Sequence, residues 1–398
     1  MSSPSLAVVN IGDSHAGDLT GGSIEGDALV ARDGLISWIG ATADVDLDSC
    51  DQVLDIAGAA LVPGLIDSHV HTTFGDYTPR QRTVGFLESY LHGGVTRAIS
   101  ASEVHVPGRP TDVVGVKALA IAAQRSYLNY RPGGVSVHAG SVVLEPGLSG
   151  SDFSDLRQAG VWLAKAGFGA FTRPRDYVPV VQAARQAGLV VMFHTGGGSI
   201  RGSLELIDAD VLLESRPNVL GHVNGGPTAL ADADVRRLVT EGSDMALQLV
   251  QAGNLRSAID IAGLALEHGA AARLMIASDT PTGTGVIPLA LLRTMAELTS
   301  LGPLSPGLAI AACTGNVADI YGLDAGRLRV GAPADLLVLD APLGSQADDW
   351  RGALRLGDLP GVAAVATQGE VRFARSRNTP PAKRPSTLTR GESRPVPW

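Results

Sequence analysis

The sequence predicts an α/β protein, a TIM-type (β/α)8 barrel joined to a small β-sandwich formed by the N- and C-terminal segments. Three observations support this prediction. The chain has 398 residues, which suits one large barrel with an appended smaller module. Short apolar runs alternate with helical patterns from residue 64 to residue 279, as in repeated β/α units. The two flanks carry valine- and leucine-rich runs with turn residues and no comparable helices.

Eight predicted strands follow in order along the chain. They cover residues 64–71, 95–101, 134–142, 161–169, 189–195, 219–225, 244–250 and 273–279. Amphipathic patterns lie between them, for example over 111–129 and 176–188, and the second ends at a glycine that suits a helix C-terminus. In a barrel of this type, functional groups lie at the C-terminal ends of the strands.

The flanks predict the second unit. Residues 1–60 and about 326–375 are expected to pair into one β-sandwich, which leaves 61–325 for the barrel. The tail 376–398 is rich in Pro, Arg and Ser. We expect it to be an extended arm on a neighbouring subunit or a disordered tail.

Composition excludes several classes of protein. A net charge of -9 and 4% aromatic residues argue against nucleic-acid binding. No apolar run approaches the roughly 18 residues that span a bilayer, and the N-terminal residues lack a signal-peptide pattern, so we expect a cytoplasmic protein. Cys50 and Cys313 belong to no CxxC pattern and are expected to be reduced and buried.

Ionisable residues at the strand ends indicate a metal site. His69 and His71 leave the first strand on the same face, because alternate side chains of a strand point the same way. His194 ends the fifth strand, His222 lies in the sixth, and Asp279 ends the eighth. Imidazoles and a carboxylate suit Zn, Fe and Mn alike. We therefore expect two divalent ions, with a single ion held by His69, His71, His194 and Asp279 as the alternative.

Lys165, in the fourth strand, completes the predicted ligand set. Only three lysines occur in the chain, and this one lies in an apolar run. A lysine can lose its charge or be carbamylated, whereas an arginine cannot. An ammonium group is a poor ligand, but a carbamylated Lys165 would offer a carboxylate that bridges two ions.

Five further residues are candidates for substrate binding. His105 and His138 follow the second and third strands, so each either faces the substrate or satisfies a loop. Arg109 suits a substrate carboxylate through its planar fork, or is a surface arginine. Thr195 and Asn224 lie beside predicted metal ligands and are expected to hydrogen-bond the substrate. The remaining histidines are expected to be structural or solvated: His15, His92 and His268.

Several motifs carry a resemblance to a known family. "PGLIDSHVH", the later histidines and aspartate, and the closing "CTGNVADIYGLDAGRLRVGAPADLLVLD" resemble the amidohydrolase superfamily over nearly the whole chain. "LHGGVTRAISA", "FHTGGGSI", "GHVNGGPTA" and "SDTPTGTGVIPL" are similar to the enamidases of bacterial nicotinate degradation. The enamidases place a glutamate near the end of the fourth strand, where this chain reads "LAKAGFG".

The resemblance implies a metal-dependent hydrolase that opens a cyclic amide. The implied substrate is 1,4,5,6-tetrahydro-6-oxonicotinate, the products are 2-formylglutarate and ammonia, and the implied assembly is a homotetramer. Asp279 would take a proton from metal-activated hydroxide and deliver it to the leaving nitrogen. The alternatives are another cyclic amidase or deaminase, such as a dihydroorotase, hydantoinase or imidazolone-type enzyme, or a non-catalytic barrel that serves as a scaffold.

Overall fold

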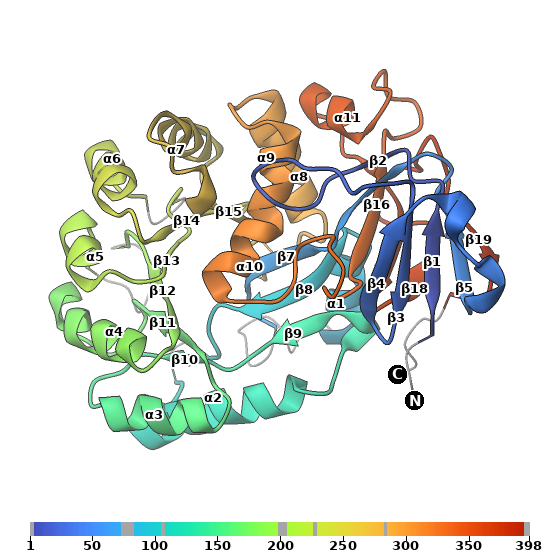
Figure 1. Ribbon diagram of the computed structural model, residues 1–398. Coiled ribbons are helices and arrows are strands. Elements are labelled where there is room, and N and C mark those ends of the chain that lie inside the picture. Colours follow the sequence, from blue (N-terminus) through green and yellow to red (C-terminus); the bar gives the residue numbers. More distant parts are fainter. Residues whose placement is uncertain are drawn as a thin grey trace.

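The structure is a computed structural model that describes residues 4–72, 83–104, 108–197, 205–225, 229–281 and 285–393 (Figure 1). It has mixed α/β content, which confirms the predicted class. Parallel strands with surrounding helices make up one part of the molecule, and two five-stranded sheets built from the chain ends make up the other. None of the helices in the described ranges is long and apolar enough to cross a membrane.

The parallel strands form a three-stranded and a six-stranded sheet. The first has the order β7 (Leu65–Val70), β8 (Val95–Ser100), β9 (Ser136–His138). The second has the order β10 (Ser141–Val143), β11 (Leu163–Ala166), β12 (Val190–His194), β13 (Val219–Gly221), β14 (Ala246–Val250), β15 (Leu274–Ala277). Each of the eight strand regions expected from the sequence therefore contains at least one strand, and the third contains two.

Two links join these parallel sheets. Val70, at the end of β7, forms a parallel bridge with Thr280, just after β15, and the backbone N–H of His71 donates to the Thr280 carbonyl at 3.0 Å. β9 and β10 are separated only by Ala139 and Gly140. Gly140 has φ +96°, and a Cβ there would lie 2.8 Å from the Ala120 carbonyl oxygen, so the break requires a glycine.

Helices separate the parallel strands and bury one face against them. Seven of them are α1 (Thr83–Leu91), α2 (Val113–Tyr127), α3 (Gly150–Gln158), α4 (Tyr177–Gln186), α5 (Ala209–Ser215), α6 (Asp232–Glu241) and α7 (Leu255–Glu267). The later ones are α8 (Ala290–Ser300), α9 (Pro306–Cys313), α10 (Gly315–Tyr321) and α11 (Trp350–Leu356). Several begin at a side-chain cap, such as Asp112, which accepts from the Gly115 N–H of α2.

The parallel strands are buried on both faces. In β12, Val191 belongs to the core under the helices, whereas the next residue, Met192, belongs to a second core together with Ile66 of β7 and Leu163 of β11. Alternate side chains thus point into two different cores. This explains why these strands read as nearly continuous apolar runs in the sequence.

The chain ends form the two remaining sheets. One has the order β19 (Thr387–Arg390), β5 (Gln52–Asp55), β1 (Leu6–Val9), β3 (Ala28–Arg32), β4 (Leu35–Gly40). The other has the order β18 (Glu370–Phe373), β17 (Gly361–Thr367), β16 (Leu336–Asp340), β6 (Ala60–Pro63), β2 (Asp13–Ser14). One hydrophobic cluster contains residues of both sheets, for example Leu29 of β3 and Val338 of β16.

The segment after residue 375 contacts the rest of its own chain. The sequence predicted an extended arm on a neighbouring subunit or a disordered tail for 376–398, and that prediction stays untested in a single chain. β19 pairs antiparallel with β5, and the Ser376 hydroxyl donates to the His92 carbonyl at 2.7 Å. Arg384 forms an ion pair with Asp340, whose carboxylate is fully buried. Arg384 is therefore the charged partner that the buried Asp340 carboxylate needs, and the ion pair holds this segment against β16.

Candidate metal centre

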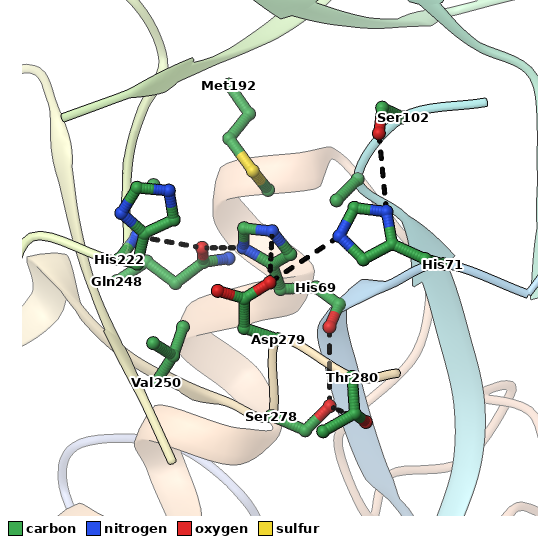
Figure 2. A network of polar contacts seen from close by, with 12 residues as sticks. His69, His71, Ser102, Met192, His222, Gln248, Val250, Ser278, Asp279 and Thr280 are labelled. Carbon is green, nitrogen blue, oxygen red and sulfur yellow. Dashed lines mark hydrogen bonds and ion pairs between the residues drawn. The ribbon is translucent and has the colours of Figure 1, made fainter. Parts of the chain in front are cut away.

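Three candidate ligands converge where the two parallel sheets meet. His69 lies in β7, His71 follows it directly and Asp279 follows β15, so the pairing of Val70 with Thr280 brings them together. The Nε2 atoms of His69 and His71 lie 3.1 and 3.5 Å from Oδ1 of Asp279 (Figure 2). One ligand atom from each of the three residues lies within 4.8 Å of the others. This geometry is suited to a single cation between them.

The other nitrogen of each imidazole faces a protein side chain. His69 Nδ1 lies 2.6 Å from Oε1 of Gln248, and His71 Nδ1 lies 3.3 Å from the hydroxyl of Ser102. Histidines that bind metals commonly use the second ring nitrogen in this way, since such a contact fixes the orientation of the ring. Both rings therefore turn Nε2 toward Asp279.

His194 and His222 extend the group to neighbouring strands. The ring centroid of His222 lies 5.7 Å from that of His69 and 4.4 Å from that of His194. Within the described part of the chain, neither ring nitrogen of His194 has a hydrogen-bond partner, although the residue is only 1% exposed. Buried polar atoms without a partner are costly, so this histidine has the character of a ligand whose partner is an ion.

Lys165 lies beside these imidazoles. It is 1% exposed, and its Nζ lies 3.5 Å from His69 Nε2 and 3.2 Å from the sulfur of Met192. Burial lowers the pKa of Lys165 to about 8, against the opposing effect of Asp279. The neutral amine, which is the form that reacts with carbon dioxide, is therefore accessible near neutral pH.

The protonation states suit cation binding. Burial holds the pKa of His69 and His194 well below the usual range and lowers the pKa of His222 to about 4, so the rings are neutral at pH 7. Burial opposes ionisation of Asp279, but His69 and the hydrogen bond of His71 keep its pKa well below the usual value. Neutral imidazoles and one carboxylate are a donor set for a divalent ion.

Two of these residues have unusual backbone conformations. His222 has φ 41° and Asp279 has φ 57°, in the left-handed region that favours glycine. The backbone N–H of Asp279 donates to the His69 carbonyl at 3.0 Å, which holds the strained turn against β7. Strain of this kind in residues other than glycine is concentrated at functional sites.

Thr195 and Asn224, the candidates for substrate contacts, also bond to neighbouring strands. The Thr195 hydroxyl donates to the Gly221 carbonyl at 3.0 Å. The Asn224 side chain accepts from the Val250 N–H at 2.9 Å and donates to the Val250 carbonyl at 3.0 Å. Both side chains are buried and tie together the ends of adjacent strands, where backbone groups need hydrogen-bond partners. The predicted contacts with a substrate stay untested.

Arg109, a candidate for binding a substrate carboxylate, has an internal partner. Its guanidinium pairs with the carboxylate of Glu145 and donates to the Phe168 carbonyl at 2.5 Å. The side chains are 8% and 0% exposed, so this ion pair is internal. A buried carboxylate needs a charged or hydrogen-bonding partner, and Arg109 provides it for Glu145. The predicted contact with a substrate stays untested.

His138 lies away from the convergent group, and His105 lies outside the described residues. His138 ends β9, and Val143, further along the adjoining β10, is the residue paired with Lys165. His138 lines a cavity of about 240 Å³ together with Arg97, Gln124, Arg131 and Trp162. As far as the described residues show, none of the six candidate ligands lines this cavity.

Gln248 and Glu145 are the residues that sequence reasoning missed. Gln248 is the one polar side chain in the run "MALQLV", and a polar residue at an inward position of a buried strand was an available signal. Glu145 lies in "VVLEPG", just after an apolar strand, which was a similar signal.

Comparisons with known proteins agree with this arrangement. The model of the amidohydrolase family matches residues 60–372. The chain is 44% identical over 383 residues to an enamidase from Eubacterium barkeri, which covers 96% of this chain and 98% of that protein. It is 30% identical over 410 residues to an imidazolonepropionase from Pseudomonas aeruginosa (strain UCBPP-PA14), with 87% and 95% covered.

A solved structure has the same fold over nearly the full length. A crystal structure of an enamidase superimposes with a TM-score of 0.91 and 43% sequence identity, covering 96% of this chain and 100% of that chain. A putative prolidase from Bifidobacterium longum reaches a TM-score of 0.61 at 20% identity, which is a likeness of fold alone.

Proposed function

The chain belongs to the amidohydrolase family, and from that premise we propose that it is an enamidase-type hydrolase that opens a cyclic amide at its C–N bond. The observation that carries the proposal is the convergence of His69, His71 and Asp279 in a chain 44% identical to an enamidase over 96% of its length. A non-catalytic scaffold would have no reason to keep these side chains largely buried and directed at one point.

The proposed substrate is 1,4,5,6-tetrahydro-6-oxonicotinate. One water adds to the ring carbonyl and the C–N bond breaks, which releases an enamine. The enamine tautomerises to an imine, and a second water replaces its nitrogen, so that 2-formylglutarate and ammonia are formed. The likeness to the enamidase over 96% of this chain supports this substrate over other cyclic amides.

We propose that the group holds two divalent ions, with Zn, Fe or Mn as candidates. His69, His71, His194, His222 and Asp279 would be the ligands, and a carbamylated Lys165 would bridge. The orphaned nitrogens of His194 and the facing Nε2 and Oδ1 atoms of His69 and Asp279 support the fit. A divalent metal bound there lowers the pKa of a water molecule toward neutrality and polarises a carbonyl.

Asp279 is the proposed proton carrier. Its side chain is 17% exposed, compared with 1% for His69 and 7% for His71, so it is the most accessible of the three. Its low pKa keeps it ionised before the reaction, ready to take the proton from the attacking water. It would then deliver that proton to the leaving nitrogen.

We also propose the architecture that is typical of this family. The bridge between Val70 and Thr280 and the adjacency of β9 and β10 support one closed eight-stranded barrel over residues 61–325. The shared core of the two five-stranded sheets supports a β-sandwich built from 1–60 and 326–375, with β19 added at one edge. A homotetramer is the assembly that the resemblance implies, and light scattering on the purified protein would test it.

Turnover of the cyclic enamide by metal-replete protein is the test of this function. Elemental mass spectrometry first establishes the metal content, and release of ammonia and aldehyde is then followed with the tetrahydro-oxonicotinate. The control substrate is an imidazolone, because the chain is also 30% identical to an imidazolonepropionase. Absence of enamide turnover alongside imidazolone turnover would move the assignment to that second activity.

A further inference from the structure

Gln248 lies at the centre of the candidate metal centre without being a metal ligand. It belongs to β14, a strand that contributes none of the predicted ligands, and it is fully buried. Its Oε1 lies 2.6 Å from Nδ1 of His69 and 3.4 Å from the backbone nitrogen of His222. Its Nε2 donates to the Ser68 hydroxyl at 2.9 Å and to the Ser68 carbonyl at 3.4 Å.

These contacts determine which way the amide points. The backbone N–H of His222 is only a donor, so the atom of Gln248 that faces it must be the oxygen. The backbone carbonyl of Ser68 is only an acceptor, so the atom that faces it must be the nitrogen. Both contacts place the amide oxygen against His69, and Nδ1 of His69 must therefore carry the proton.

The protonated Nδ1 leaves Nε2 of His69 with a lone pair. Nε2 lies 3.1 Å from the Asp279 carboxylate, so two electron-rich atoms face each other. A cation between them turns this repulsion into two favourable contacts. In the opposite tautomer, Nε2 would donate its own proton to Asp279 and close the site as a hydrogen bond.

We propose that Gln248 is a positioning residue that holds His69 in the tautomer able to bind metal. Ser68 supports the role by fixing the amide nitrogen. The same oxygen accepts from the backbone of His222, so one side chain sets both the ring of one candidate ligand and the turn that carries another. The inference rests on the proposed function in one respect, that the group binds a divalent ion.

Two variants of Gln248 and one matched control test this proposal. Gln248→Leu removes the acceptor, and Gln248→Glu keeps an acceptor oxygen toward His69. Gln251→Leu makes the same chemical change just beyond β14, where Oε1 of Gln251 accepts from the Thr294 hydroxyl at 2.6 Å. Zinc affinity is measured by competition with a chromophoric chelator, and cobalt-substituted protein reports the ligand geometry by its visible spectrum.

We expect Gln248→Leu to weaken zinc binding by about 10- to 100-fold and to alter the cobalt spectrum. The zinc affinities of Gln248→Glu and Gln251→Leu should stay within about threefold of the wild-type affinity, which is a small change compared with the loss in Gln248→Leu. The unfolding temperatures of the metal-free variants show whether the lower zinc affinity results from a less stable fold. Similar unfolding temperatures for Gln248→Leu and Gln251→Leu support the proposal.

Three results would overturn the inference. They are unchanged zinc affinity in Gln248→Leu, an equal loss in Gln248→Glu, and an equal loss in Gln251→Leu. If the wild type itself bound no divalent metal, the proposed function would fail together with the inference. If the wild type bound metal and hydrolysed the enamide while Gln248→Leu bound zinc equally well, only the inference would fail.

Discussion

The candidate metal centre and the cavity at His138 both contain a histidine with a lowered pKa, yet the charges that surround these histidines have opposite sign. At the metal centre, His69 and His71 face the carboxylate of Asp279. At the cavity, burial together with Arg97 and Arg131 lowers the pKa of His138 to about 3. A perturbed histidine therefore does not by itself identify a reactive site. What distinguishes the metal centre is that its donor atoms converge on one point.

The largest difference between the two regions should appear with Asp279→Asn. The amide cannot accept the proton of the attacking water, so kcat should fall about a thousandfold, while most of the metal should be retained because the candidate histidine ligands remain. Steady-state assays and elemental analysis on the same preparation measure both quantities. Activity within tenfold of the wild type would remove Asp279 from the proton path.

The second-largest effect is expected when Arg109 is replaced. Arg109→Met leaves the buried Glu145 carboxylate without its partner, and we expect a loss of about 3 kcal/mol in the free energy of unfolding. The double variant Arg109→Met/Glu145→Leu should recover most of that loss in urea unfolding. A raised KM with unchanged stability would instead return Arg109 to the substrate-binding role predicted from the sequence.

The variant Lys165→Ala tests whether Lys165 is needed to bind a second metal ion. If a carbamylated Lys165 bridges two ions, the variant should retain about one metal per chain instead of two, and a short carboxylic acid in the buffer should restore part of the activity. Elemental mass spectrometry on wild type and variant in parallel provides the stoichiometry. Equal metal content in both proteins would contradict the bridging role.

His138→Asn should have the smallest effect at pH 7. Turnover and metal content should stay close to the wild type, with stability changed by about 1 kcal/mol, since the residue lines the separate cavity. A marked fall in turnover would show that the two regions are coupled.

The pH dependence of stability provides a second signature of His138. Its folded pKa of about 3 lies below the ordinary 6.5, so the unfolded chain binds the extra proton between these values. Stability is therefore lost as the pH falls from about 6.5 toward 3, by up to about 1.4 kcal/mol per pH unit. Unfolding of metal-free His138→Asn should show a shallower slope than the wild type over that range.

Much of the fold was predictable because it depends on periodic patterns. The predicted strand 95–101 corresponds to β8 (Val95–Ser100), and the predicted helix 176–188 corresponds to α4 (Tyr177–Gln186). The α/β class, the amidohydrolase family and the enamidase likeness are confirmed. Strand ends were harder to place, because the apolar pattern continues past the last ladder hydrogen bond.

The candidate site was predictable where strand position alone decides the outcome. His69, His71 and Asp279 converge because they end strands that are neighbours in space. The sequence contains no comparable rule for the partner of a loop residue, so it could not predict that Arg109 pairs with Glu145 or that Asn224 braces Val250. The sequence could not show that the third predicted strand is broken at Gly140, so that His138 ends β9 and lines a separate cavity; its predicted contact with a substrate stays untested.

The left-handed backbone at His222 and Asp279 sets a limit on how this protein can be improved. At both positions, glycine would relieve the conformational cost of the left-handed backbone. The same replacements would remove an imidazole or a carboxylate from the candidate ligands. A selection for heat resistance alone would therefore enrich inactive proteins at these two positions, and any thermostable enzyme of this sequence must gain its stability elsewhere.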